Sequence, residues 1–272
     1  MTTLLKTENL SKTYPGFRLD NVSLCVNSGE IVGFIGRNGA GKSTTLKSLL
    51  GFVHPDSGST EFFGMPFSDN ENRIKQQIGF VPGGVDYYPK SRIKSLLDVT
   101  KRFYDGWDEK TCKTLLDKFG ISEKKTPSEL SAGMKVKLAL TLALSHGAKL
   151  LILDEPTSGL DPVSRDELLD ILLDLRKEGI GILFSTHIIS DLERAADRII
   201  YIQNGKIAAD RTVKEFESDY RIISYRERPT GIELIGEREE RDGFTALVKT
   251  ETGLGEKAGL EDIMLHLERG SK

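Results

Sequence analysis

The stretch Gly36-Arg-Asn-Gly-Ala-Gly-Lys-Ser43 decides the fold of this chain. It fits the pattern G-x-x-x-x-G-K-[ST], and it stands between a predicted buried strand, Ile31–Ile35, and a predicted helix, Lys42–Leu50. Glycines allow consecutive backbone N–H groups to curl around a phosphate chain, and the helix adds its positive N-terminal end. We therefore expect a nucleotide-phosphate site here, because a glycine-rich turn that matches by chance rarely has this strand–loop–helix context.

Two side chains of this loop have specific expected roles. Lys42 should reach the β- and γ-phosphates of a bound nucleotide, and the Ser43 hydroxyl should ligate Mg²⁺. The other residues expected to hold the nucleotide are Gly36, Arg37, Asn38, Gly39, Ala40, Gly41 and Thr44. The motif predicts binding of a nucleotide with Mg²⁺, but it does not specify the reaction that follows.

Outside this loop, short apolar runs alternate with helical patterns, which predicts an α/β fold with a mainly parallel sheet. Further buried strands are expected at Ile78–Val81, Leu150–Leu153 and Gly181–Ser185. Pro162 is well placed to open a long helix, since proline is tolerated in a first helical turn. Two amphipathic helices are expected around Ile93–Thr100 and Leu115–Phe119.

The sequence changes character after about residue 211. Two alternating runs, Ile232–Ile235 and Phe244–Val248, flank the turn signal Asp242-Gly243, so a hairpin is expected. Apolar residues then recur at helical spacing through Leu260, Ile263, Met264 and Leu267. Residues 221–272 are therefore predicted to form a small appendage of β-hairpin and helix.

Composition excludes several classes of protein. The chain has 272 residues with 41 acidic and 38 basic groups, a net charge of −3 that argues against bulk nucleic-acid binding. No apolar run approaches the roughly 20 residues needed to cross a bilayer, and the N-terminus lacks the features of a signal peptide. Cys25 and Cys112 lie far apart, which disfavours a disulfide framework or a thiolate metal site. We expect a soluble, cytoplasmic protein.

A pair of acids follows the predicted strand Leu150–Leu153. The acids are Asp154 and Glu155, and Pro156 comes directly after them. At the carboxyl end of a parallel strand, such acids face the crevice where ligands bind. Asp154 suits the shell of Mg²⁺, and Glu155 suits the polarisation of an attacking water. The alternative, a pair that caps the next helix, is weaker because the phosphate loop is also present.

The segment Leu130-Ser-Ala-Gly-Met134 resembles the signature segment, usually written LSGGQ, of the ATP-binding cassette (ABC) ATPases. Ala132 and Met134 depart from the common form. In that family the serine and second glycine, here Ser131 and Gly133, meet the γ-phosphate of ATP on another subunit. The N-terminus of a helix is suited to bind an anion such as phosphate. Taken alone, however, a pentapeptide of this kind is equally explained by a serine that caps a helix.

The order and spacing of further motifs strengthen the resemblance. Ser158-Gly-Leu-Asp161 resembles the D-loop at the dimer interface, which places Asp161 near the nucleotide. Ser185-Thr-His187 resembles the segment whose switch histidine contacts the γ-phosphate, so that His187 joins Glu155 and Lys42 as an expected catalytic residue. Tyr14 stands where cassettes place an aromatic ring that stacks on adenine.

The resemblance covers roughly residues 3–218 and implies a P-loop NTPase fold, a RecA-like core with an antiparallel β subdomain and a helical subdomain. It implies an ATP-binding domain over residues 1–220, with its helical part at about 91–147, followed by the appendage at 221–272. The implied function is ATP hydrolysis by an ABC transporter subunit that powers a separate integral-membrane permease, with export favoured. Two cassettes would sandwich ATP between them, in a homodimer or a heterodimer. The implied location is the inner face of the membrane, and no nucleic acid is expected as a partner.

Two other functions fit parts of the sequence. A soluble cassette ATPase that acts on a ribosome or on DNA is the main alternative, but such proteins usually carry two cassettes or a long coiled-coil insertion. A P-loop kinase is a third possibility, against which the Ser131–Gly133 and His187 motifs argue.

One position departs from the family pattern. After the strand at Ile78–Val81, cassettes commonly place a glutamine that ligates Mg²⁺, whereas this chain has Pro82-Gly83-Gly84. Gln76 and Gln77 come too early. Either Asp86 or water would have to complete the metal shell.

Overall fold

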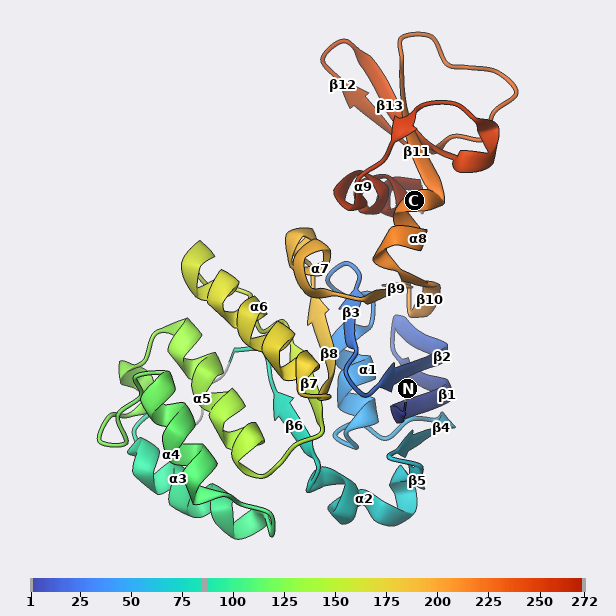
Figure 1. The fold of residues 1–272 in the computed structure, drawn as a ribbon. Coiled ribbons are helices and arrows are strands. Elements are labelled where there is room, and N and C mark those ends of the chain that lie inside the picture. The colour runs from blue at the N-terminus through green and yellow to red at the C-terminus, as the bar shows by residue number, and fades with distance from the viewer. Residues whose placement is uncertain (1, 85–87, 271–272) are drawn as a thin grey trace.

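The strand that precedes the phosphate loop, β3 (Ile31–Ile35), lies in the middle of a six-stranded sheet in the computed structural model, which describes residues 2–84 and 88–270. The strand order is β10-β9-β3-β8-β7-β6, in which only the β9–β10 pair is antiparallel (Figure 1). The other strands are β6 (Ile78–Val81), β7 (Leu150–Asp154), β8 (Gly181–Thr186), β9 (Arg198–Gln203) and β10 (Lys206–Thr212). The predicted α/β fold with a mainly parallel sheet is confirmed.

Both faces of this sheet are buried, which explains why its strands are continuous apolar runs. Because side chains alternate along a strand, Ile31 and Ile35 of β3 pack in one apolar cluster, and Val32 and Phe34 pack in the opposite one. The first cluster lies under three helices, α5 (Ala132–Ser145), α6 (Pro162–Lys177) and α7 (Ile189–Ala195). The second lies under α1 (Lys42–Leu49) and a separate antiparallel sheet.

The antiparallel sheet has the order β2-β1-β4-β5 and comes mostly from the N-terminal segment. Its bounds are β1 (Thr3–Tyr14), β2 (Phe17–Asn27), β4 (Ser57–Phe62) and β5 (Met65–Pro66), and α2 (Phe67–Lys75) follows. The family resemblance implied such a subdomain without locating its strands. Leu5, Leu10 and Phe62 point into the apolar cluster shared with the central sheet, so the two sheets form one core.

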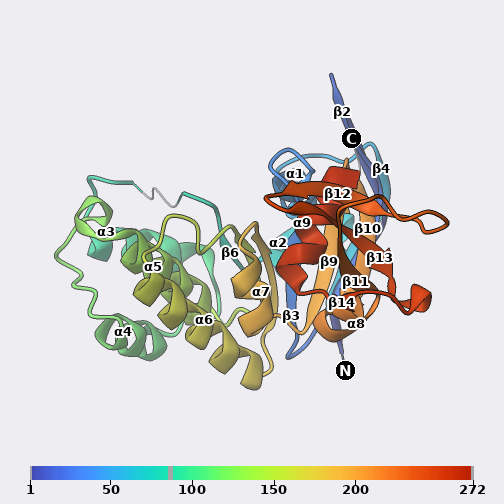
Figure 2. The same ribbon diagram turned by 90° about the horizontal axis from the view of Figure 1, so that it is seen from above.

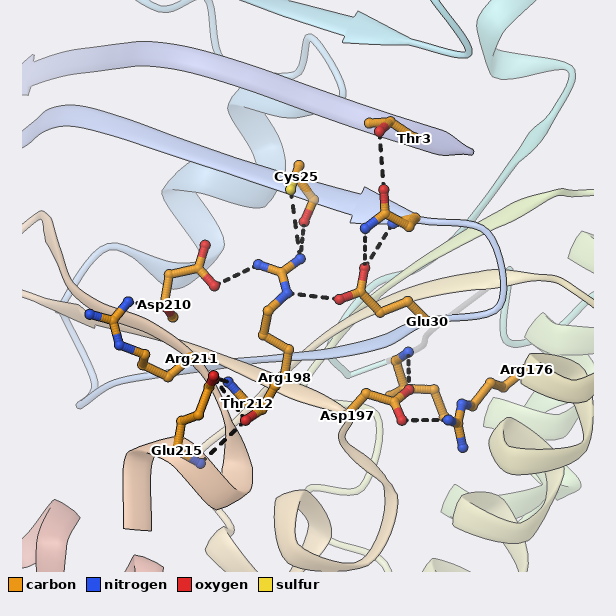
Figure 3. Close-up of polar contacts among 12 residues, drawn as sticks. Thr3, Cys25, Glu30, Arg176, Asp197, Arg198, Asp210, Arg211, Thr212 and Glu215 are labelled. Atoms are coloured by element: carbon orange, nitrogen blue, oxygen red, sulfur yellow. Dashed lines mark hydrogen bonds and ion pairs between the residues drawn. The ribbon is translucent and has the colours of Figure 1, made fainter. Parts of the chain in front are cut away.

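A polar cluster also joins the two sheets (Figure 3). Arg198 of β9 donates hydrogen bonds to Glu30 Oε1 at 2.7 Å, to Asp210 Oδ1 at 2.5 Å and to the backbone oxygen of Cys25 at 2.7 Å. Glu30 in turn accepts from the backbone and the side chain of Asn27, both at 2.9 Å. The guanidinium is largely buried, and the carboxylates of Glu30 and Asp210 compensate its charge.

The helical part of the chain has an apolar core of its own. It comprises α3 (Ile93–Thr100), the 3₁₀ turn η1 (Lys101–Phe103), α4 (Glu109–Lys118) and η2 (Pro127–Glu129), with one side of α5. Ile93, Leu97 and Leu116 pack there against Leu138 and Leu142 of α5. These helices stand beside the central sheet, at its β6 edge, in both ribbon views (Figures 1 and 2). The helices predicted at Ile93–Thr100 and around Leu115 are confirmed.

The C-terminal segment begins after α8 (Val213–Ser218) and contains more strands than the sequence predicts. Its sheet has the order β12-β13-β11-β14, with bounds Ile235–Glu240, Gly243–Lys249, Tyr220–Tyr225 and Glu256–Lys257, and η3 (Thr250–Thr252) precedes β14. The hairpin of β12 and β13 is confirmed, although β12 begins at Ile235 rather than at Ile232, since pairing with β13 starts there. The helix α9 (Leu260–Gly270) buries Leu260, Ile263 and Met264 in the same cluster as the central sheet.

Candidate functional site

The phosphate loop has the backbone shape that its glycines predict. Gly39 and Gly41 have positive φ angles of 84° and 117°, which favour glycine over any L residue with a side chain. Gly36 has a different reason to be glycine, because a Cβ there would lie 2.3 Å from the backbone oxygen of Ile202. The Ala40 N–H donates to the Arg37 oxygen at 3.0 Å and closes the turn.

Lys42 lies at the start of α1 with its ammonium group inside the loop. Its Nζ donates to the Gly36 oxygen at 2.6 Å and to the Arg37 oxygen at 3.3 Å, and the residue is only 5% exposed. Glu155 Oε1 lies 3.5 Å from the same Nζ. The lysine thus stands between the phosphate loop and Glu155, the acid that follows β7.

The two acids at the end of β7 are held by Ser185, the residue next to them on β8. Ser185 Oγ donates to Asp154 Oδ1 at 2.6 Å and accepts from the Glu155 N–H at 2.9 Å. Glu155 has a positive φ of 47°, a backbone conformation that costs energy for a residue other than glycine and is often found at functional sites. The sequence pattern predicts Ser185 only as the end of a strand, whereas the structure shows that it orients both acids.

His187 completes the group of predicted catalytic residues. Its Nδ1 lies 3.2 Å from Glu155 Oε2, and its side chain is about half exposed. The structure therefore brings Lys42, Glu155 and His187 together around one carboxylate, although 145 residues separate the first from the last in the sequence.

A buried acid that the sequence does not single out supports the segments around this site. Asp191 of α7 is fully buried, and it accepts hydrogen bonds from Thr157 Oγ1 at 2.6 Å and from Thr186 Oγ1 at 3.4 Å. Arg165 of α6 donates to the other oxygen of this carboxylate. Asp191 thus ties the residues that follow Glu155 to the residue that precedes His187.

The predicted binding residues Ser131, Gly133 and Asp161 lie at the N-termini of α5 and α6. Ser131 caps α5 by accepting from the Met134 N–H at 3.3 Å, and a Cβ on Gly133 would contact Ser164 of α6 at 3.0 Å. Asp161 caps α6 by accepting from the N–H groups of Val163 and Ser164. Hydrogen bonds from the Ser164 side chain and backbone hold the pKa of Asp161 below its usual range.

Tyr14 lies at the end of β1 with 38% of its surface exposed, and Lys12 Nζ stands 6.0 Å from its ring centroid. An exposed ring at this position is available for stacking, as the resemblance implies.

The residues predicted to hold Mg²⁺ fit that ion when phosphate oxygens join them. Within residues 2–84 and 88–270, no group of three or more His, Cys, Asp or Glu side chains is arranged to hold a metal. Mg²⁺ needs no such cage, because it commonly binds through one or two protein oxygens, substrate phosphates and water. Asp154, oriented by Ser185, and the exposed hydroxyl of Ser43 would supply those oxygens.

Comparison with known proteins agrees with this geometry. A family model described as "ABC transporter" matches residues 19–158. The chain belongs to the ABC transporter family. It is 36% identical over 211 residues to the bacitracin transport ATP-binding protein BcrA of Bacillus licheniformis, covering 76% of this chain and 69% of that protein. It is also 36% identical over 278 residues to the Nod factor export ATP-binding protein I of Burkholderia pseudomallei, covering 92% and 91%.

A solved structure described as the ATP-binding subunit of an ABC transporter superposes with a TM-score of 0.72, at 32% identity over 79% of this chain and 92% of that one. The ABC ATPase fold, with ATP as substrate, is therefore confirmed. The relatives support a transporter subunit rather than a ribosome- or DNA-directed ATPase. None of the helices that the structure describes is long and apolar enough to cross a membrane.

Gly83 and Gly84 follow β6, where the resemblance implies a glutamine. Gly84 has a positive φ of 68°, whereas a Cβ on Gly83 would lie 3.0 Å from the backbone oxygen of Asp154. The chain at Gly83 therefore passes close to the backbone of the acid expected to bind Mg²⁺. Asp86, the suggested substitute, lies outside the described residues.

Proposed function

We propose that this chain hydrolyses ATP at the site around Glu155 and thereby drives a separate membrane permease that exports its substrate. The observation that carries the catalytic part is the position of Glu155, whose two carboxylate oxygens lie 3.5 Å from Lys42 Nζ and 3.2 Å from His187 Nδ1. A carboxylate held between a phosphate-binding lysine and a histidine is suited to accept a proton from the water that attacks the γ-phosphate.

The roles of the other residues follow from their places. Lys42 pairs with the β- and γ-phosphates, and His187 holds the carboxylate and contacts the γ-phosphate. Ser43 and Asp154 hold Mg²⁺, which neutralises phosphate charge when bound. The backbone of residues 36–44 cradles the phosphates, and Tyr14 stacks on the adenine.

Two variants test this assignment. Lys42→Ala should abolish tight ATP binding, and Lys47→Ala, at an exposed position on the same helix, is the matched control that should bind normally. Glu155→Gln should bind ATP but turn over about 100-fold or more slowly, since an amide cannot accept the proton. Binding is measured by titration with a fluorescent ATP analogue, and turnover by phosphate release. Normal affinity in Lys42→Ala, or near-normal turnover in Glu155→Gln, would refute the corresponding role.

We also propose that two cassettes act as a pair. Ser131 and Asp161 are the N-caps of α5 and α6, and Gly133 lies in the first turn of α5, so all three stand at helix N-termini where a second subunit could present its ATP. The N-terminus of α5 offers N–H groups and a positive end to that phosphate chain. Because Glu155→Gln keeps ATP bound, it should accumulate an ATP-dependent dimer in size-exclusion chromatography, either as a homodimer or with a related cassette.

A groove between α2, α3 and α5 suits the permease. It encloses about 810 Å³ and exposes large apolar side chains, including Phe52 at 60%, Val99 at 49% and Phe103 at 70%. Arg102 lies on the same groove, as does Lys75, whose charge is paired with Glu71 at 2.5 Å. An apolar groove with an arginine at its rim fits an amphipathic helix. We propose that a cytoplasmic helix of the permease docks here and places this chain at the inner face of the membrane.

The direction of transport is proposed from the relatives, one of which is described as a Nod factor export protein and another as a bacitracin transport protein. The permease rather than this chain would select the transported compound.

The docking proposal is tested with membranes of cells that express this chain. Phe103→Asp should lower copurification of a multi-span membrane protein after detergent extraction. Leu254→Asp is the control, because Leu254 is also exposed, at 44%, but lies in the C-terminal segment. Equal copurification of the two variants would refute the groove as the docking site.

A further inference from the structure

The C-terminal helix α9 lies next to the nucleotide site. It contacts α7 and α8 at the end of the central sheet, as both ribbon views show (Figures 1 and 2). A cavity of about 710 Å³ lies between α9 and the catalytic loops, lined by Arg37 and His187 on one side and by Glu261, Met264 and Glu268 on the other. The C-terminal segment therefore borders the nucleotide site, and no function has been assigned to this segment.

A carboxylate on α9 connects this helix to the phosphate loop. Glu268 Oε2 lies 3.7 Å from Arg37 Nε, and Glu268 Oε1 accepts a hydrogen bond from the Tyr201 hydroxyl at 2.8 Å. Gln203 donates to the same hydroxyl at 2.8 Å and to the Leu267 backbone oxygen at 3.4 Å. Tyr201 lies on β9, where it pairs with Ile35 of β3. Through Tyr201, the Glu268 carboxylate is therefore held beside the strand that precedes the phosphate loop.

Glu268 is better ordered for this contact than an ordinary surface acid. Its side chain is only 18% exposed, whereas that of Arg37 is 62% exposed, and Tyr201 is fully buried. Burial, together with the neighbouring Glu268 carboxylate, raises the pKa of Tyr201 strongly, so the phenol remains a donor at physiological pH. Because Tyr201 already fixes the carboxylate, pairing with Arg37 costs less side-chain entropy than an isolated surface pair does.

The backbone of Arg37 carries this contact to the catalytic lysine. The Arg37 oxygen accepts from the Ala40 N–H at 3.0 Å and from Lys42 Nζ at 3.3 Å. A change in the position of Arg37 therefore changes both the turn of the loop and the placement of the ammonium group. Preorganisation of such a loop improves binding, since less order is lost when the ligand arrives.

We propose that Glu268 is a positioning residue for ATP binding, which holds Arg37 and thereby fixes the phosphate loop from the C-terminal segment. This inference rests on the proposed assignment of residues 36–44 as the phosphate loop. The C-terminal segment is then more than an appendage, because ATP and α9 are energetically coupled. By reciprocity, bound ATP stabilises α9 by the amount that α9 improves ATP affinity.

The test is a double-mutant cycle in the full chain with Glu268→Gln and Arg37→Gln. Each single variant should weaken ATP binding by about two- to fivefold and raise KM with little change in kcat, the range typical of one partly exposed ion pair. Glu268→Gln should have no further effect in the Arg37→Gln background. Glu261→Gln, on the same helix and the same cavity, should leave affinity unchanged.

Two results would overturn the proposal. One is unchanged affinity in Glu268→Gln. The other is a loss of ATP affinity on Glu268→Gln that is equal in the presence and absence of Arg37. That result would show that Glu268 acts only on the general stability of the fold, and the thermal midpoint of unfolding without nucleotide would then fall as well. Lys42→Ala separates these outcomes from failure of the proposed function, because ATP affinity that survives that change refutes the loop assignment itself.

Discussion

Replacement of Ser185 by alanine removes a buried hydroxyl that serves both acids of the site. Ser185 is fully buried, its Oγ donates to Asp154 Oδ1 at 2.6 Å, and it accepts from the Glu155 N–H at 2.9 Å. A hydrogen bond to a charged group contributes about 1.5–3 kcal/mol. The second bond contributes less, because the Glu155 N–H also donates to the Ser185 backbone oxygen, at 3.1 Å. We therefore expect Ser185→Ala to lower the free energy of unfolding by about 2–4 kcal/mol.

The assay is urea denaturation, in which the shift in midpoint multiplied by the slope gives the change in unfolding free energy. Ser48→Ala is the matched control, because Ser48 is also buried but its hydroxyl makes no hydrogen bond within the part of the chain that the structure describes. That control should be neutral or stabilising, since alanine is the better helix former on α1. Equal changes in the two variants would refute the argument that Ser185 stabilises the acids.

Three further perturbations have defined outcomes. Burial favours a raised pKa for Glu30, but hydrogen bonds from Arg198 and Asn27 outweigh it and hold the pKa below its usual range. The stabilisation that Glu30 provides is therefore complete above about pH 4.3 and is lost as pH falls further. Urea midpoints should show a smaller decline with falling pH in Glu30→Gln than in the wild type. Gly83→Ala and Gly83→Gln should both lower basal ATPase, because a Cβ 3.0 Å from the Asp154 backbone oxygen requires the backbone of that acid to shift; a gain of ATPase with glutamine alone would contradict this. Thr212→Ala removes the capping box of α8 and should cost about 1 kcal/mol by thermal unfolding, whereas an unchanged midpoint would show that the cap contributes nothing.

The strands that the sequence predicts well are those buried on both faces. Ile31–Ile35 and Ile78–Val81 are found at the predicted bounds, because continuous apolar runs leave little choice of structure. The N-terminal strands β1 and β2 are different, since charged and apolar residues mix along them and register shifts interrupt their pairing. A short-range pattern does not identify strands of that kind, and the same holds for β11 and β14 in the C-terminal sheet.

The site divides in a similar way. The grouping of Lys42, Glu155 and His187 is predictable, because each stands in a motif directly after a parallel strand, and the carboxyl ends of these strands meet at one edge of the sheet. Ser185 and Asp191 are not predictable from motifs, because their importance arises from partners 26 to 34 residues away. The Arg37–Glu268 contact joins residues that are far apart in the sequence, and only the folded structure reveals it.

The separate apolar core of the helical part has a consequence for how the protein opens in solution. Leu138 and Leu142 of α5 belong to that core, whereas Ala139, Leu140 and Ala143 of the same helix belong to the core of the central sheet. Backbone amides of α3 and α4 should therefore exchange with deuterium as one cooperative unit, at a rate set by their own small core. Amides of α5 should exchange more slowly, with the central sheet, so that this helix is the mechanical link between the outer helices and the strand that ends in Asp154.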